Sequence, residues 1–184
     1  MSDPAIATAT QQILMAVQHP EQQPVVKTFF DEKTFTASHV VHDPQTLTAA
    51  VIDSVLDYDQ ASGRIKYDSA QKIVDYVRTE KLQVAWQLET HAHADHLSAA
   101  PWLQEQLGGK LGIGANIVQV QEVFGKIFNA DTRFARDGSQ FDHLFTDGEQ
   151  FKLGNLNAIA LHVPGHTSAD MAFTIGDAAF IGHT

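Results

Sequence analysis

The chain has 184 residues, of which 43% are hydrophobic and 18% charged, and its formal net charge at pH 7 is −10. These values predict a single globular, soluble domain that buries roughly 70% of its unfolded surface. The acidic balance and the lack of any basic run exclude a nucleic-acid-binding surface, while an anionic small substrate stays compatible because a metal can reverse the local field.

The sequence contains no cysteine, so disulfides, thiol nucleophiles and thiolate metal ligands are all excluded. No stretch approaches the ~20 apolar residues that a membrane span needs, and residues 1–16 lack the pattern of a signal peptide. We therefore expect a cytoplasmic protein that does not associate with membranes.

The first half of the chain mixes strands and helices. Helical spacing predicts helices over residues 5–17 and 69–82, and β-branched and aromatic residues predict strands over 24–30, 34–42, 47–52 and 84–88. Residues 57–66, which contain Ser62-Gly63, are expected to form a polar loop. We assign residues 1–23 to an N-terminal extension and residues 24–184 to the domain itself.

The second half alternates helices and strands and then becomes β-rich. Helices are predicted over residues 97–107, ended by Gly108-Gly109, and over 117–128, with a strand at 110–113 between them. Strands follow at 141–145, 150–153, 156–162, 171–175 and 178–181, with tight turns at Asp147-Gly148 and Gly176-Asp177. This order predicts a layered α/β domain with two sheets inside and helices outside.

The stretch Thr-His-Ala-His-Ala-Asp-His at residues 90–96 is the strongest functional signal. Imidazole and carboxylate are the ligands that zinc and iron take where thiolate is absent. His91 and His93 leave the end of a buried strand two residues apart and so point to the same side. A turn then brings Asp95 and His96 back toward the same space, which predicts a metal site.

Two further histidines follow strand ends. His166 lies in Pro164-Gly165-His166-Thr167, and we expect it to enclose the metal from a second side. His183, next to last in the chain, is either another ligand or a frayed terminal residue.

Asp53 ends a strand and either braces the metal loops or caps a turn. The five remaining histidines have no evident chemical partner in the sequence and are assigned to structure or surface: His19, His39, His42, His143 and His162.

These motifs and their order resemble the metallo-β-lactamase superfamily, whose signature T-H-x-H-x-D-H matches residues 90–96, and the likeness extends from residue 24 to the end. It implies a four-layer αββα fold. Ala92, Ala94 and Leu-Ser-Ala-Ala at residues 97–100 resemble the persulfide dioxygenase branch and its bacterial β-lactamase-like hydrolase relatives. The glyoxalase II thioesterases, a sister branch, usually have bulkier residues inside the motif.

The resemblance implies two alternative ligand sets. A dinuclear zinc hydrolase would use His91, His93 and His166 for one metal, and Asp95, His96 and a later histidine for the other. A persulfide dioxygenase would hold a single iron with His91, His166 and the carboxylate of a Gly-Asp-Thr-like turn.

The sequence departs from the family pattern twice. It reads Gly182-His183-Thr184 where the family has Gly-Asp-Thr, and it stops where relatives continue through further strands and helices. A sheet left open at residues 178–181 would expose an edge. Two explanations remain open: the chain is a piece of a longer protein, or it covers this edge by forming a homo-oligomer.

Three functions follow from these observations. The first is an Fe(II) dioxygenase that oxidises a low-molecular-weight, glutathione-type persulfide to sulfite. The second is a mononuclear Zn(II) hydrolase of thioesters, in which zinc lowers the pKa of water to about 7 and Asp95 acts as the catalytic residue that orients or deprotonates it. The third is a non-catalytic fragment that retains the fold.

Overall fold

The computed structural model describes residues 3–93, 96–129 and 135–182. Its helices and strands are, in chain order, α1 (Pro4–Gln18), β1 (Val25–Asp31), β2 (Thr36–His42), β3 (Thr48–Ile52), β4 (Val55–Asp59), β5 (Arg64–Lys66), α2 (Asp68–Thr79), β6 (Gln83–Leu88), β7 (Leu97–Ser98), α3 (Ala100–Leu107), β8 (Lys110–Gly114), α4 (Ile117–Ile127), β9 (His143–Phe145), β10 (Glu149–Leu153), β11 (Leu156–His162), β12 (Met171–Ile175) and β13 (Ala178–Phe180). A short 3₁₀ turn, Pro20–Gln22, follows α1. In the described part of the chain, no helix is long and apolar enough to cross a membrane.

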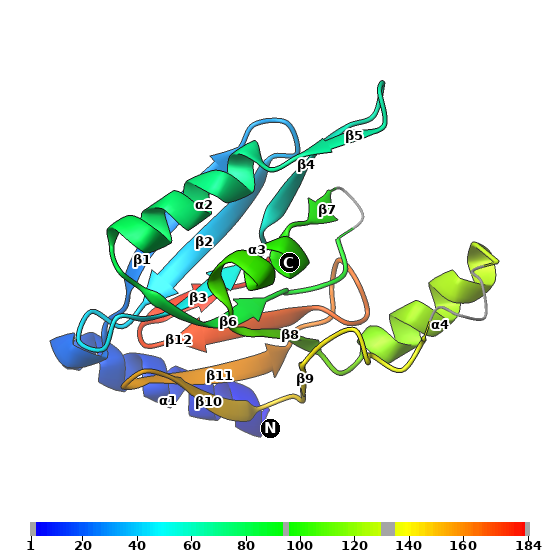
Figure 1. Ribbon diagram of the computed structural model, residues 1–184. Helices are drawn as coiled ribbons and strands as arrows, with labels where there is room; N and C mark the ends of the chain where they lie inside the picture. The colour runs from blue at the N-terminus through cyan, green and yellow to red at the C-terminus, as the bar shows by residue number, and fades with distance from the viewer. Residues whose placement is uncertain (1–2, 94–95, 130–134, 183–184) are drawn as a thin grey trace.

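Two main sheets form the centre of the molecule (Figure 1). The first has the strand order β1-β2-β3-β6-β8-β9, with antiparallel pairs at the β1 end and parallel pairs from β3 onward. The second, β10-β11-β12-β13, is antiparallel throughout. A small third sheet has the order β5-β4-β7.

The layers follow from which side chains each strand buries. Alternate residues of β11 point to opposite faces, so Leu156, Ala158 and Ala160 pack against the first sheet, while Ile159 and Leu161 pack against α1. On the other side of the first sheet, the buried face of α2 and residues of α3 form a separate core. The order of layers is α2 and α3, first sheet, second sheet, α1, which is the predicted αββα arrangement.

The predicted loop at residues 57–66 is wrong, because β4 and β5 form an antiparallel hairpin there. Its exposed polar residues lack the hydrophobic alternation that marks a half-buried strand. The hairpin closes through Gly63, whose φ of +65° lies in the left-handed region.

Two helix boundaries also differ from the prediction. Leu97 and Ser98 form β7, which pairs with β4, and α3 begins only at Ala100, with Pro101 in its first turn. Proline fits the first turn because its missing N–H has no intrahelical partner there. The helix predicted to reach residue 82 ends at Thr79, because Lys81 adopts a positive φ of +56° and turns the chain toward β6.

Asp43 links the two main sheets at the end of the molecule where β2 turns into β3. Its carboxylate accepts hydrogen bonds from the backbone N–H of Gln45 and of Asn155, and from Thr46 Oγ1, each at 2.8 Å. Asn155 belongs to the turn between β10 and β11. The fully buried side chain of Asp43 therefore joins strand ends of both sheets. Burial alone would raise the pKa of the Asp43 carboxyl, but these hydrogen bonds outweigh burial and lower it.

Replacing Asp43 by Asn should lower the free energy of unfolding at pH 7 by about 2 kcal/mol, because a charge-assisted hydrogen bond contributes about 1.5–3 kcal/mol. A carboxyl whose folded pKa is lowered stabilises the fold above its unfolded pKa of about 3.9 and loses that effect as the pH falls through the folded value. Urea unfolding should therefore show a gap between wild type and variant at pH 7 that narrows below about pH 4. Asp59→Asn, in an exposed turn, is the control, and an equal loss there would contradict the account.

Candidate metal centre

The candidate site lies where parallel strands of the first sheet end. Asp53 directly follows β3, and Glu89 to His93 directly follow β6, its parallel neighbour. The backbone N–H of Asp53 donates to the carbonyl of Leu88 at 3.0 Å, and that of Glu89 donates to the carbonyl of Gly112 in β8 at 3.0 Å. The carboxyl ends of parallel strands are where open α/β sheets bind ligands.

Asp53 holds the beginning of the histidine loop. Its two carboxylate oxygens accept from the backbone N–H of Thr90 at 2.7 Å and from Thr90 Oγ1 at 2.8 Å. Asp53 has a φ of +52°, a region that aspartate tolerates better than most residues. The carbonyl of Thr90 accepts from the N–H of Met171 in β12 at 2.8 Å, so Thr90 is fixed to both sheets. The alternatives left open for Asp53 are thus decided in favour of a brace.

This arrangement determines the tautomer of His91. The Thr90 hydroxyl donates its only hydrogen to the acceptor-only carboxylate of Asp53, so toward His91 Nδ1, at 2.9 Å, it is an acceptor. His91 therefore carries its hydrogen on Nδ1 and the lone pair on Nε2. The side chain is almost completely buried.

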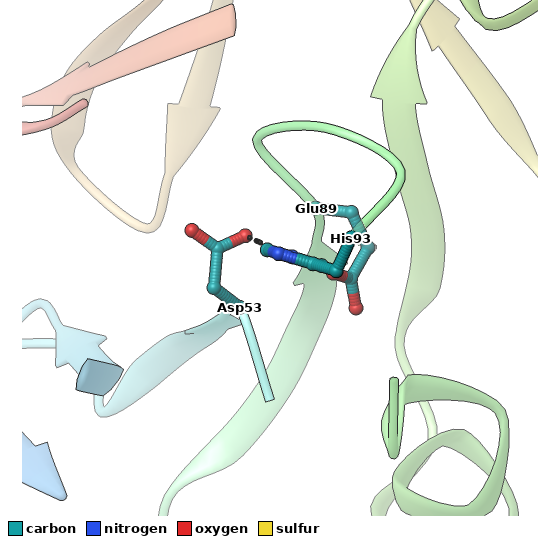
Figure 2. A group of neighbouring side chains, drawn as sticks. All are labelled: Asp53, Glu89 and His93. Atoms are coloured by element: carbon teal, nitrogen blue, oxygen red, sulfur yellow. Dashed lines mark hydrogen bonds and ion pairs between the residues drawn. The ribbon is translucent and has the colours of Figure 1, made fainter. Parts of the chain in front are cut away.

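His93 points toward two buried carboxylates. Its Nε2 lies 2.9 Å from Glu89 Oε2 and 3.3 Å from Asp53 Oδ1. Figure 2 shows the three side chains together. The second Glu89 oxygen accepts from Ser98 Oγ at 2.6 Å. Asp53, Glu89 and His93 each offer a ligand atom within 4.8 Å of the others, a spacing that could also hold an ion.

The four motif histidines that the structure describes form one continuous group. The ring centroids of His91 and His93 are 4.1 Å apart, those of His93 and His96 are 4.1 Å apart and stacked, and His91 meets His166 edge to face at 5.2 Å. His96 Nδ1 lies 3.0 Å from the carbonyl of Leu97, so this nitrogen is the donor and Nε2 has the lone pair. The structure brings these four predicted residues together, and their role as ligands stays a prediction.

The His166 loop has its own carboxylate brace, which sequence analysis missed. Asp170, buried directly before β12, accepts hydrogen bonds from the N–H of Thr167 at 2.8 Å and from Thr167 Oγ1. Its carbonyl accepts from the N–H of Val163 at 2.9 Å, which closes the loop. The exposed His166 ring is thus presented from a short, internally bonded turn.

Asp95 and His183 lie outside the described residues. Gly182, directly before His183, does contact the site, because it lies against Thr90. A Cβ atom at Gly182 would sit 2.5 Å from Thr90 Oγ1, and its φ of +60° favours glycine.

The charges of the site depend on one another. Burial would lower the pKa of His93, but its hydrogen bonds with Asp53 and Glu89 raise it to about 10. Burial raises the pKa of the Glu89 carboxyl. For Asp53, burial is outweighed by hydrogen bonds and attraction from His93 and by hydrogen bonds from Thr90, and its pKa is lowered. Asp53 is therefore the stronger acid of the two buried carboxyls.

The ring nitrogens of the site histidines are oriented in the way that is common for metal ligands. A metal-binding histidine commonly donates its other ring N–H to a carboxylate, a carbonyl or a similar acceptor. His91, His93 and His96 each do this, to Thr90, to the two carboxylates and to Leu97 respectively. Once His93 gives up the proton that its raised pKa retains, the three imidazoles so oriented would present Nε2, Nδ1 and Nε2 as ligand atoms.

A cavity of about 480 Å³ opens beside the site. It is lined by Asp53, His91 and His93 and also by His39 of β2, which sequence analysis assigned to structure or surface. Neither His39 nor Glu89 was a predicted site residue. Glu89 directly precedes the motif, and that position was the one available signal; nothing in the local sequence marks His39.

Sequence comparison identifies the family. The metallo-β-lactamase superfamily profile matches residues 34–181. The chain is 47% identical over 169 residues to a probable metallo-hydrolase of Burkholderia pseudomallei, covering 86% of this chain and 58% of that protein. It is 40% identical over 161 residues to glyoxylase B2 of Dictyostelium discoideum, covering 86% and 55%. The chain thus spans a little more than half the length of these relatives.

Two more distant matches carry the name ETHE1, and one of them is named as a persulfide dioxygenase. Persulfide dioxygenase ETHE1 of Bos taurus is 24% identical over 153 residues, which cover 83% of this chain and 48% of that protein. The crystal structure of ETHE1 from Myxococcus xanthus superposes with a TM-score of 0.63 at 22% identity, covering 85% and 56%. The chain belongs to the metallo-β-lactamase superfamily, whose members named here include metal-dependent hydrolases and a dioxygenase.

Replacing Asp53 by Asn should weaken metal binding by about 10–100-fold, the usual effect of losing a partner that orients a ligand. The amide nitrogen cannot accept from the Thr90 hydroxyl, so the tautomer of His91 is no longer fixed. Equilibrium dialysis against Zn(II) measures the change. Asp142→Asn is the matched control, because that carboxylate accepts from Leu111 N–H and Gln104 Nε2 away from the histidines. Equal affinities for wild type and Asp53→Asn would refute the brace.

Proposed function

We propose that this chain is the metal-binding part of a non-haem iron persulfide dioxygenase, which oxidises a low-molecular-weight, glutathione-type persulfide to sulfite. The supporting observation is that His91 and His166 meet edge to face across the site at 5.2 Å. The carboxylates of Glu89 and Asp53 bond to Nε2 of His93 and raise its pKa to about 10, so this ring holds a proton that a metal would have to displace. His91 and His166 are the pair that the resemblance assigns to a single iron.

The chemistry divides between the metal and the protein. Bound iron would allow molecular oxygen to react with the sulfur of the substrate. Overall, a persulfide, O2 and water give a thiol, sulfite and protons. The residues of the chain hold the site in shape: Asp53 fixes Thr90, Thr90 fixes the ring of His91, and Asp170 fixes the turn that carries His166.

Zinc-dependent thioester hydrolysis is the second candidate. It is favoured by His96, the histidine that the resemblance assigns to a second metal, which stacks on His93 at 4.1 Å with its lone pair on Nε2. Relatives named metallo-hydrolase and glyoxylase point the same way. In this reading Asp95, outside the described residues, orients or deprotonates the attacking water.

Metal analysis combined with an oxygen electrode distinguishes the two. Protein purified without a metal-affinity tag should hold about one equivalent of iron and consume oxygen with glutathione persulfide. His91→Ala and His166→Ala should each lose the iron and reduce oxygen uptake by more than about 100-fold, since even the partners of ligands contribute 10–100-fold. His143→Ala, at a half-buried histidine of β9 that bonds to Glu149 and does not line the cavity, should change neither. Zinc together with thioester hydrolysis and no oxygen uptake would support the hydrolase instead.

Replacing His183 by Asp tests the departure from the family pattern. If His183 is a ligand, the natural set is three neutral imidazoles, and a carboxylate would bind Fe(II) more tightly and better stabilise higher oxidation states. The variant should therefore show higher iron content and faster oxygen uptake than wild type. No gain in either quantity would mean that His183 is not a ligand.

A further inference from the structure

The cavity beside the site is poor in charge. It lies between strands of the first sheet and β13 of the second, and its walls are largely apolar, with contributions from Val26, Phe35, Ala37 and Ala178 to Ile181. Among the described residues that line it, Asp53 is the single charged group apart from the histidines, and there is no lysine or arginine. Apart from a bound metal and the cationic His93, an anionic group that enters this space would therefore rely on neutral hydrogen-bond donors.

His39 is such a donor, and its ring is held from several sides. It lies in the middle of β2, paired with Thr28 of β1 and Ile52 of β3. Its Nδ1 is 3.0 Å from Thr28 Oγ1, and its ring packs on Phe180 of β13 at 5.2 Å. Burial lowers the pKa of His39, and the nearby Asp53 opposes this only in part, so the imidazole is neutral at pH 7.

We propose that His39 is a substrate-binding residue that donates its Nε2 hydrogen to the terminal sulfur of the persulfide. The proposal rests on the dioxygenase function proposed above. In this proposal the Thr28 hydroxyl, 3.0 Å from Nδ1, donates to that nitrogen, and the ring hydrogen sits on Nε2. A persulfide is a stronger acid than the corresponding thiol, so its terminal sulfur enters the cavity as an anion.

The surroundings of His39 suit this ligand. An anion that leaves water for a mostly apolar cavity is stabilised only if it gains hydrogen bonds there. The apolar wall formed by Phe35, Ala178 and Phe180 matches the second sulfur and the adjoining methylene group, which are polarisable and uncharged. His39 thereby selects the sulfur end of the substrate and turns it toward His91.

Steady-state oxygen uptake with glutathione persulfide tests the proposal in three variants. His39→Phe keeps a planar ring against Phe180 and removes the donor, so the KM for persulfide should rise about tenfold, as expected for a lost hydrogen bond to a charged group. The kcat, the KM for O2 and the iron content should stay within about twofold, since the lost contact affects substrate binding alone. His39→Gln, whose amide nitrogen lies near the position of Nε2, should restore most of the affinity. His143→Phe, the same change outside the cavity, should behave as wild type.

The outcomes separate the two proposals. If wild type is active and His39→Phe keeps its KM for persulfide, the role of His39 is refuted and the dioxygenase stands. If both His39 variants lose iron or kcat to the same extent, His39 is a structural residue and the proposal is likewise refuted. If iron-loaded wild type consumes no oxygen with persulfide, the dioxygenase function fails, and the role of His39 falls with it.

Discussion

The site depends on one buried carboxylate, that of Asp53. Removing a charged group from water costs several kcal/mol, so the ion must find hydrogen-bond donors inside the protein. It finds the N–H and hydroxyl of Thr90 and the Nε2 of His93. The bond from the Thr90 N–H holds the start of the histidine loop, and the bond from the Thr90 hydroxyl sets the tautomer of His91. The bond with His93 turns that ring toward Glu89.

The two sheets meet at the same point. Thr90 extends from the first sheet and bonds to Met171 at the start of β12, while Asp170, one residue earlier, holds the turn with His166. Each histidine loop thus has its own buried aspartate, and the backbone bond between Thr90 and Met171 sets the loops against each other. Away from the site the link between the sheets is a carboxylate, because Asp43 accepts from the N–H of Asn155.

Much of this could be predicted from sequence, and the failures have physical causes. The bounds of β11 and β12 were predicted correctly because long apolar runs between turns are strong local signals. The motif histidines were recognised because their spacing is rare. The β4–β5 hairpin was missed because it is exposed. Asp170 was missed because its contact with Thr167 exists only in the folded chain, and the same holds for the contact with Phe180 that accompanies the role proposed for His39.

The most direct test of the account is a crystal structure of the iron-loaded protein with anomalous scattering recorded at the iron edge. We expect a single peak bonded to Nε2 of His91 and to His166, with Nε2 of His93 still hydrogen-bonded to Glu89 and Asp53. Two metal peaks, with His93 and His96 among the ligands, would contradict the single-iron site and favour the dinuclear arrangement of the hydrolases.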